Sequence, residues 1–188
     1  MIRCVRAFAV VALLVTGVVL VTTASPAGAV ACTVEQASDT ESPGDVSGAS
    51  VNEDGTKVVV TSFVGLDGDP NPGNDRELFV YDTVADTFTR ITDAAAGTGD
   101  SYQAAIDDDG DHVAFASSAD LTGGNADHNQ EIFLWAAPST ITQLTTTVAP
   151  TGSGVPAING TGSVVAYLQA SAGSSRIYLD DGPAARYR

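Results

Sequence analysis

The stretch of the chain with the most metal-binding chemistry is 67–77, which reads DGDPNPGNDRE. Its oxygen-bearing side chains are Asp67, Asp69, Asn71, Asp75 and Glu77. Calcium takes about six to eight oxygen ligands, often from loops rich in such residues. The stretch departs from the EF-hand pattern, because Pro72 stands where that pattern has glycine. These residues are therefore a candidate calcium site, and no other cofactor is expected.

The same residue types also form turns that need no ligand. The segment NPGNDRELFVYD at 71–82 returns as NADHNQEIFLWA at 125–136. The counterparts of the candidate ligands in this second copy are Asp120, Asn125, Asp127, Asn129 and Glu131. The repetition favours a turn that leads into a strand, and calcium remains the alternative for the first copy, whose additional oxygens lie at Asp67, Asp69 and Asn71.

Other candidate chemistry is sparse. The acidic segments NEDG at 52–55 and DDDG at 107–110 are typical of tight hairpin turns, in which glycine adopts a positive φ. His112 is expected at a surface or edge of a strand, and His128 at a position with left-handed backbone. The sequence contains neither a G-x-S-x-G elbow nor a phosphate-binding glycine loop. No catalytic residue is predicted, and the residues argue against an enzyme more than for one.

The segments that carry these loops recur with a period of about fifty residues. Each is short, rich in Val, Ile, Phe, Tyr and Thr, and bounded by Gly, Asp and Asn, which is typical of strands joined by turns. The expected strand regions are 47–62, 77–82 and 87–92 in the first unit, 101–117, 131–136 and 140–145 in the second, and 154–169 and 176–181 in the third. The aromatic residues expected in the core of these strands are Phe79, Tyr81, Phe115, Phe133, Trp135, Tyr167 and Tyr178.

Four short strands per repeat predict an all-β protein built of β-propeller blades. The motifs at 51–62 and 106–117, followed by ELF or EIF and then RIT or QLT, resemble the TolB-like, WD-like propeller repeat of bacterial exported proteins. The predicted organisation is a signal peptide at 1–31, a polar linker at 32–46 and a partial propeller at 47–188. Its blades are expected at 47–94 and 100–146, with a partial blade at 153–181.

The beginning of the chain has the pattern of a secretory signal. Arg3 and Arg6 precede an apolar run, and small residues follow up to Ala31. The run is shorter than a membrane span requires, so no span is expected in the mature chain. Export to the cell envelope or outside the cell is therefore predicted. Lipidation of Cys32 is the less favoured alternative, because Ala29 replaces the usual leucine of a lipoprotein motif.

The charge of the chain excludes several classes of partner. The whole chain carries 23 acidic and 8 basic residues, and loss of Arg3 and Arg6 with the signal would leave a net charge of −17. Nucleic acids and anionic lipids are bound through clusters of Lys and Arg, and this sequence contains no such cluster. Such a charge suits a soluble exported protein.

These observations predict a binding or scaffold module that engages a protein or a cell-envelope component. The alternative is the opening propeller of a larger exported hydrolase or other propeller enzyme. Propellers close with about four to eight blades, and this chain supplies fewer than three complete ones. It is therefore expected to be part of a longer propeller, or to self-associate through open blade edges.

Overall fold

The computed structural model describes residues 2–5, 31–34, 36–37 and 46–181. The chain divides into two compact units, 1–39 and 40–188. In the first unit, β1 (Ile2–Val5) pairs antiparallel with β2 (Ala31–Val34). No strand was predicted here. The apolar run of the predicted signal peptide lies outside the described residues, as does most of the predicted linker, so both stay predictions.

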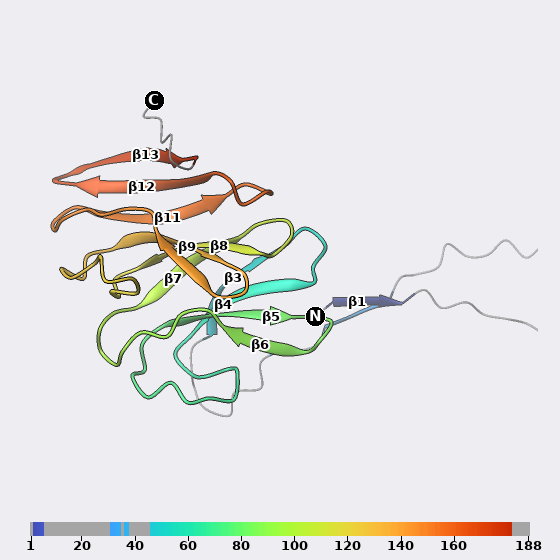
Figure 1. The fold of residues 1–188 in the computed structure, drawn as a ribbon. Coiled ribbons are helices and arrows are strands. Elements are labelled where there is room, and N and C mark those ends of the chain that lie inside the picture. The colour runs from blue at the N-terminus through green and yellow to red at the C-terminus, as the bar shows by residue number, and fades with distance from the viewer. Residues whose placement is uncertain (1, 6–30, 35, 38–45, 182–188) are drawn as a thin grey trace, which may run out of the picture. The chain divides into compact units, whose positions relative to one another are not determined.

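The second unit consists of three antiparallel sheets (Figure 1). The first contains β3 (Val46–Val51), β4 (Lys57–Ser62), β5 (Glu77–Asp82) and β6 (Thr87–Arg90). The second contains β7 (Ser101–Ile106), β8 (His112–Ser117), β9 (Glu131–Ala136) and β10 (Thr140–Gln143). The third contains β11 (Gly152–Ile158), β12 (Val165–Ser171) and β13 (Ser174–Asp180).

Each sheet is a meander in which every strand pairs with its neighbour in sequence. The prediction of an all-β fold with two four-stranded blades and part of a third is confirmed. Strands β5 and β9 have the predicted bounds, because their apolar runs end sharply at polar turn residues. Within the described residues there is no helix long and apolar enough to span a membrane.

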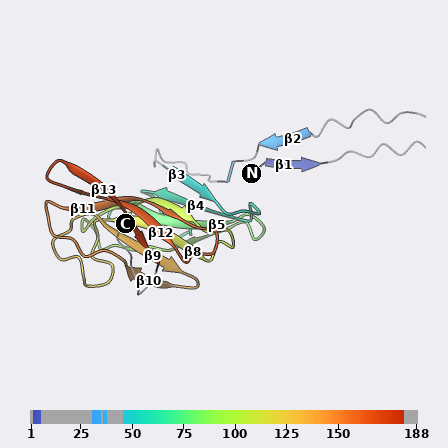
Figure 2. The same cartoon turned by 90° about the horizontal axis from the view of Figure 1, so that it is seen from above.

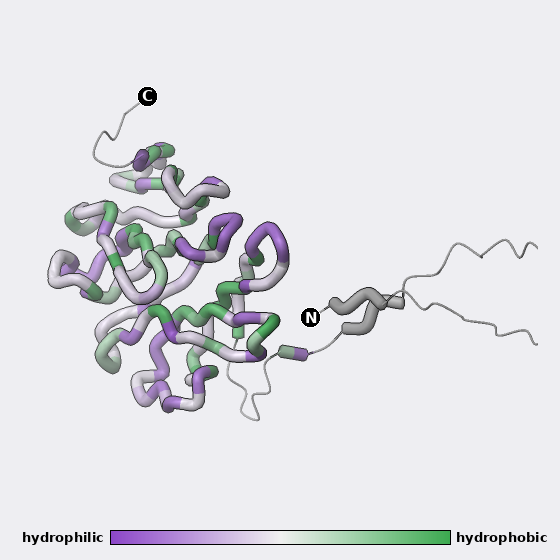
Figure 3. The backbone as a smooth tube through the Cα atoms, turned by 45° about the vertical axis from the view of Figure 1, so that its right-hand side comes forward, coloured by the Kyte–Doolittle hydropathy of each residue, from purple (hydrophilic) through white to green (hydrophobic). Residues whose placement is uncertain are grey.

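The sheets are stacked face to face, with the second sheet between the other two (Figures 1 and 2). The first strand of each later sheet packs on the sheet before it: β7 contacts β3, β4 and β5, and β11 contacts β7, β8 and β9. Figure 3 shows green, hydrophobic residues along the strands and purple, hydrophilic residues in many connecting loops. Because another sheet packs on each face of the middle sheet, alternating side chains of its strands enter two different cores.

The core between the first and second sheets is the larger. It contains Val59, Leu78 and Val80 from one sheet, and Phe115 and Phe133 from the other. The two phenylalanine rings are stacked with their centroids 5.7 Å apart. The predicted core positions of Phe115, Phe133 and Trp135 are thus confirmed. A second, smaller core contains Ala114, Ala116, Ile132 and Val165 between the second and third sheets.

The turns that join the first two strands of each sheet share one hydrogen bond, in which an Asn or Asp side-chain oxygen accepts from a backbone N–H five residues later. Asn52 Oδ1 accepts from Lys57 N–H at 2.9 Å, and Asn159 Oδ1 accepts from Val164 N–H at 2.8 Å. Asp107 Oδ1 accepts from His112 N–H at 3.1 Å in the middle sheet. These contacts mimic a backbone turn. The acidic turns at 52–55 and 107–110 therefore have a structural role, as predicted.

Candidate functional site

The candidate site lies where the loops between the second and third strands of the first two blades meet. Within the second blade's loop, Asn125 Nδ2 donates to the carbonyl oxygens of Ser118 and Asn129, at 3.3 and 2.9 Å. In the first blade, Asn71 Nδ2 donates to those of Phe63 and Asp75, at 3.0 and 2.7 Å. Each amide joins the two ends of its loop. This explains why asparagine recurs at both positions.

A residue with left-handed backbone lies three positions before the third strand of each blade. Asn74 has φ 51° and His128 has φ 52°. The prediction of left-handed backbone at His128 is confirmed. Asparagine and histidine are among the residues enriched in this region. The two loops therefore turn into β5 and β9 in the same way.

The glutamates that open β5 and β9 are fully buried. Glu77 Oε2 accepts from the Thr92 hydroxyl at 2.5 Å, and Oε1 accepts from Ala94 N–H at 2.7 Å. Thr92 Oγ1 in turn accepts from Leu78 N–H at 2.9 Å. Burial raises the pKa of Glu77, although the hydrogen bonds from Thr92 and Ala94 act in the opposite direction. The carboxylate thus binds Thr92 and Ala94, in the segment that directly follows the fourth strand, β6.

The second blade repeats this arrangement. Glu131 Oε2 accepts from the Thr145 hydroxyl, and Thr145 Oγ1 accepts from Ile132 N–H at 2.8 Å. Glu131 Oε1 accepts from the backbone N–H and the hydroxyl of Thr147, the latter at 2.6 Å. We name these two buried Glu–Thr networks, centred on Glu77 and Glu131, the glutamate clamps. In the third blade Arg176 occupies the equivalent position, opposite Gln169 in the sheet.

Arg90, from the fourth strand, organises the loop that holds the candidate ligands. Its Nη2 and Nε lie 3.0 and 3.1 Å from the two carboxylate oxygens of Asp67. The same Nη2 donates to the carbonyl oxygen of Asp69 at 2.9 Å. The guanidinium also lies 5.3 Å from the ring centroid of Phe79. Sequence reasoning missed Arg90, although it is the arginine of the RIT motif.

The ion pair affects the acid–base properties of Asp67. Burial acts to raise the pKa of this carboxyl, but the hydrogen bonds and charge of Arg90 outweigh it, and the pKa lies below the ordinary value of 3.8. The side chains of Arg90 and Asp67 are only 12% and 18% exposed. Asp67 is therefore ionised at neutral pH and held by Arg90.

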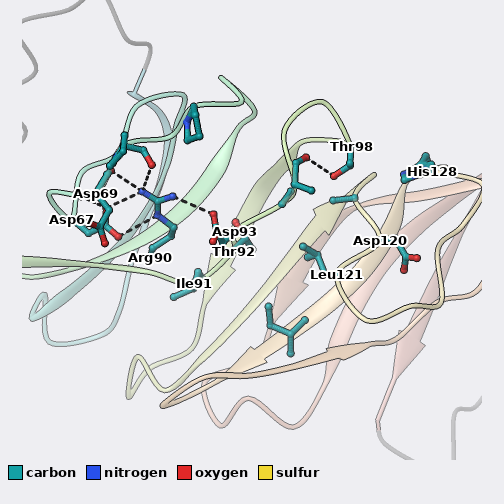
Figure 4. Close-up of a pocket in the computed structure, with 16 residues that line it drawn as sticks. Asp67, Asp69, Arg90, Ile91, Thr92, Asp93, Thr98, Asp120, Leu121 and His128 are labelled. Atoms are coloured by element: carbon teal, nitrogen blue, oxygen red, sulfur yellow. Dashed lines mark hydrogen bonds and ion pairs between the residues drawn. The ribbon is translucent and has the colours of Figure 1, made fainter.

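A cleft of about 900 Å³ opens between these loops of the first and second blades. Figure 4 shows Asp67, Asp69, Arg90 and Asp93 on one side of it, and Asp120, Leu121 and His128 on the other. The apolar residues that line the cleft include Ile91, Leu121 and Ile141. Because Arg90 is neutralised by Asp67, the remaining carboxylates make the cleft acidic.

The candidate calcium ligands do not point to one centre. Asp67 binds Arg90, Asn71 binds two carbonyl groups, and Glu77 is part of a clamp. Asp75 Oδ2 accepts from Gly97 N–H at 2.7 Å, whereas Asp69 lies at the cleft. Among the residues that the structure describes, no group of three or more His, Cys, Asp or Glu side chains is placed to hold a metal ion. These contacts hold the loop to itself and to neighbouring strands, as expected of a turn that needs no ligand. Calcium binding stays a prediction.

A thermal melt distinguishes the two interpretations. Because Asp67, Asn71, Asp75 and Glu77 already have protein partners, we expect the same melting temperature in millimolar calcium and in excess chelator. A ligand that binds only the folded state must raise the midpoint as its concentration increases. A rise with calcium that is lost in Asp69→Asn would establish a site here. Magnesium at equal ionic strength controls for screening.

One side-chain pair on the opposite end of the strands has the geometry of acid–base chemistry. His112 Nδ1 lies 2.7 Å from Asp107 Oδ2, and Asp107 is buried. Both residues belong to one hairpin, and Asp107 also receives the N–H of Asp111 and of His112. The contact therefore stabilises the turn, and sequence reasoning missed it because it treated the two residues separately.

Comparisons with known proteins identify the fold. No family profile matches the chain, and no curated protein matches its sequence. Among solved structures, the chain is similar to TolB from Acinetobacter baumannii with 17% identity and a TM-score of 0.50, covering 73% of this chain and 30% of that one. It is similar to a putative TolB from Agrobacterium tumefaciens with 18% identity and a TM-score of 0.52, covering 76% and 47%.

A third similar structure comes from a study of two prolyl endopeptidases, with 14% identity, a TM-score of 0.51, and coverage of 77% of this chain and 21% of that one. The chain thus spans less than half the length of each of these proteins. At such identities the likeness concerns the fold alone. The predicted resemblance to TolB-like propeller blades is confirmed at that level.

Proposed function

We propose that this chain is an exported binding module that recognises a protein or a cell-envelope component through the acidic cleft between its first two blades. The cleft itself carries the proposal. It combines apolar lining residues with several carboxylates, which is the composition of a recognition site. Export is supported by the basic, apolar and small-residue pattern of the first 31 residues.

The charge of the cleft specifies the chemistry of the partner. Asp93 is 79% exposed, and Asp69 and Asp120 are exposed as well. Arg90 cannot attract an anion strongly, because its guanidinium is held by Asp67 and also contacts Asp93. A partner that presents Lys or Arg beside an apolar group fits this cleft. Complementary charge of this kind increases association rates and selects partners.

Charge reversal in the cleft tests the proposal. The variant Asp69→Lys/Asp93→Lys reverses two exposed charges of the cleft, whereas Asp109→Lys reverses one exposed charge in the turn at the far end of β8. Each protein is used to capture partners from a cell-envelope extract of the source organism, and candidates are then purified and titrated. We expect one partner to bind the wild type and Asp109→Lys with similar affinity, and the cleft variant at least about tenfold more weakly.

Three outcomes would contradict this proposal. Equal binding by the cleft variant and the control would place recognition elsewhere on the chain. Hydrolysis of peptide or ester substrates by the purified chain would favour the alternative of a propeller enzyme. Immunodetection of the chain only in the cytoplasm would contradict export.

A further inference from the structure

The outward face of the third sheet exposes apolar residues whose counterparts in the other two sheets are buried or, at Leu134, half-buried. Ile177, Leu179 and Leu168 are 71%, 42% and 38% exposed. Strand register identifies their counterparts, because Leu179 pairs with Ala166 as Leu134 pairs with Ala114 and Val80 with Val59. The equivalents of Ile177 are Leu78 and Ile132, and both are fully buried. Apolar surface of this kind in a soluble protein marks an interaction site.

We use the word joint for the packing of one sheet on the next, and the second unit contains two joints. These two joints indicate which element covers the equivalent face. On the first sheet the face is covered by β7, with Ile106 packed among Val59, Leu78 and Val80. On the second sheet it is covered by β11, with Ile158 packed against Ala114, Ala116 and Ile132. In both cases the first strand of the next blade lies on this face, and between the first two sheets Phe115 and Phe133 of its second and third strands pack there as well. The face of the third sheet therefore has the form that receives another first strand.

The chain carries a first strand of this type whose outer side is exposed. In β3, Val51 is the register equivalent of Ile106 and Ile158, because they pair with Val58, Val113 and Val165. Val51 is 58% exposed, whereas Ile106 is 8% exposed. Ala49, two residues earlier on the same side of β3, is also exposed. The chain thus presents both halves of one kind of joint, at opposite ends of its stack of sheets (Figure 1).

Backbone hydrogen bonds between the turns of neighbouring blades form a similar series. Glu53 N–H donates to the carbonyl oxygen of Asp108 at 3.3 Å, and Asp108 N–H donates to that of Gly160 at 3.1 Å. Glu53, Asp108 and Gly160 each follow the Asx residue that begins its turn. The next bond in the series joins Gly160 N–H to the carbonyl oxygen of a residue equivalent to Glu53. The residue of this type in a second copy is Glu53 itself.

We propose that the outward face of β12 and β13 binds β3 of a second copy of this chain, and that two copies close a six-bladed propeller. Residue 51 of each copy then contacts residue 177 of the other, as twofold symmetry requires. The three sheets of the described residues 46–181, taken twice, make six blades, within the range of about four to eight at which propellers close. Three copies would exceed that range. The proposal does not depend on the function of the acidic cleft.

The test is the mass of the purified exported chain in solution, by light scattering and sedimentation over a wide range of concentration. We expect twice the mass of one chain for the wild type. The variants Val51→Asp and Ile177→Asp each place a charge in both joints and should raise the dissociation constant at least about tenfold. The control Val148→Asp alters a residue that is 73% exposed and lies between β10 and β11, outside the joint. It should stay dimeric.

Mixing the two variants separates this joint from other contacts. One joint in a mixed pair contains Val51 and Ile177 unchanged, so the mixture should contain dimers at concentrations at which each variant alone is monomeric. Their formation also shows that both variants are folded, which circular dichroism checks independently. A monomeric wild type at all concentrations would overturn the proposal and leave the face to a further blade of a longer chain. So would a Val51→Asp variant that remains fully dimeric, because that result indicates contact between two identical faces.

Discussion

Replacement of Glu131 by alanine is expected to lower the free energy of unfolding by about 3–4 kcal/mol. The carboxylate of this buried residue accepts hydrogen bonds from Thr145 and from the backbone and side chain of Thr147. Alanine would leave these donors without their acceptor and open a cavity beside β9. Chemical denaturation, followed by circular dichroism, measures the change.

Two further variants show whether the clamp is the cause. Glu131→Gln keeps the shape and one acceptor but brings an N–H₂ group toward a donor, so we expect a loss about half as large. Glu53→Ala removes an exposed carboxylate from a turn and should change stability by less than about 0.5 kcal/mol. Equal losses in Glu131→Ala and Glu53→Ala would contradict the structural role of the clamp.

The second large effect is expected at Arg90. Arg90→Ala should cost about 2–3 kcal/mol, because it leaves the largely buried Asp67 carboxylate without its counter-charge and frees the carbonyl oxygen of Asp69. It also removes the contact with the ring of Phe79. Since the loop at 67–70 is held by this arginine, faster cleavage by proteases at that loop should accompany the loss of stability.

A matched arginine provides the control. Arg76 pairs with Asp100 at 3.1 Å, but these side chains are 41% and 34% exposed. Exposed ion pairs contribute little, so Arg76→Ala should cost no more than about 1 kcal/mol. A larger loss in Arg76→Ala than in Arg90→Ala would show that burial does not determine the strength of these pairs.

The dependence on pH provides a second readout for Arg90. The pKa of Asp67 is lower in the folded chain than its ordinary value of 3.8. The contribution of the pair is therefore present above that value and is lost as the pH falls through the lower, folded pKa. Arg90→Ala removes the main cause that lowers this pKa and leaves only the backbone N–H donors of Asp67 and Asp69, so this part of the acid dependence should become weaker. An unchanged acid limb in the variant would contradict the assignment.

Some of this architecture depends on local pattern alone. Short apolar runs such as ELFVYD and EIFLWA favour strands, because the preference of β-branched and aromatic side chains for extended backbone acts over a few residues. The recurrence of glycine at 55, 110 and 162 marks the same turn in each blade, and all three have positive φ. The blade pattern could therefore be predicted without a structure.

The roles of the acidic residues could not be predicted in that way. Glu77 and Asp67 are equally plausible metal ligands on paper, since both are carboxylates in one loop. Their partners lie on or beyond another strand: Thr92 for Glu77, and Arg90 for Asp67. Only the pairing of β5 with β6 brings these partners together, and it turns candidate ligands into structural contacts.

The sequence by itself determined the strands of the three blades, their order and their turns, because these follow from residue type over a few positions. The tertiary structure decided which side chains are neutralised, where the acidic cleft opens and which apolar face is uncovered. Ile132 and Ile177 occupy the same position of the same motif, yet one is fully buried and the other is 71% exposed. The difference arises because burial depends on whether another sheet packs on that face, which a local pattern does not record.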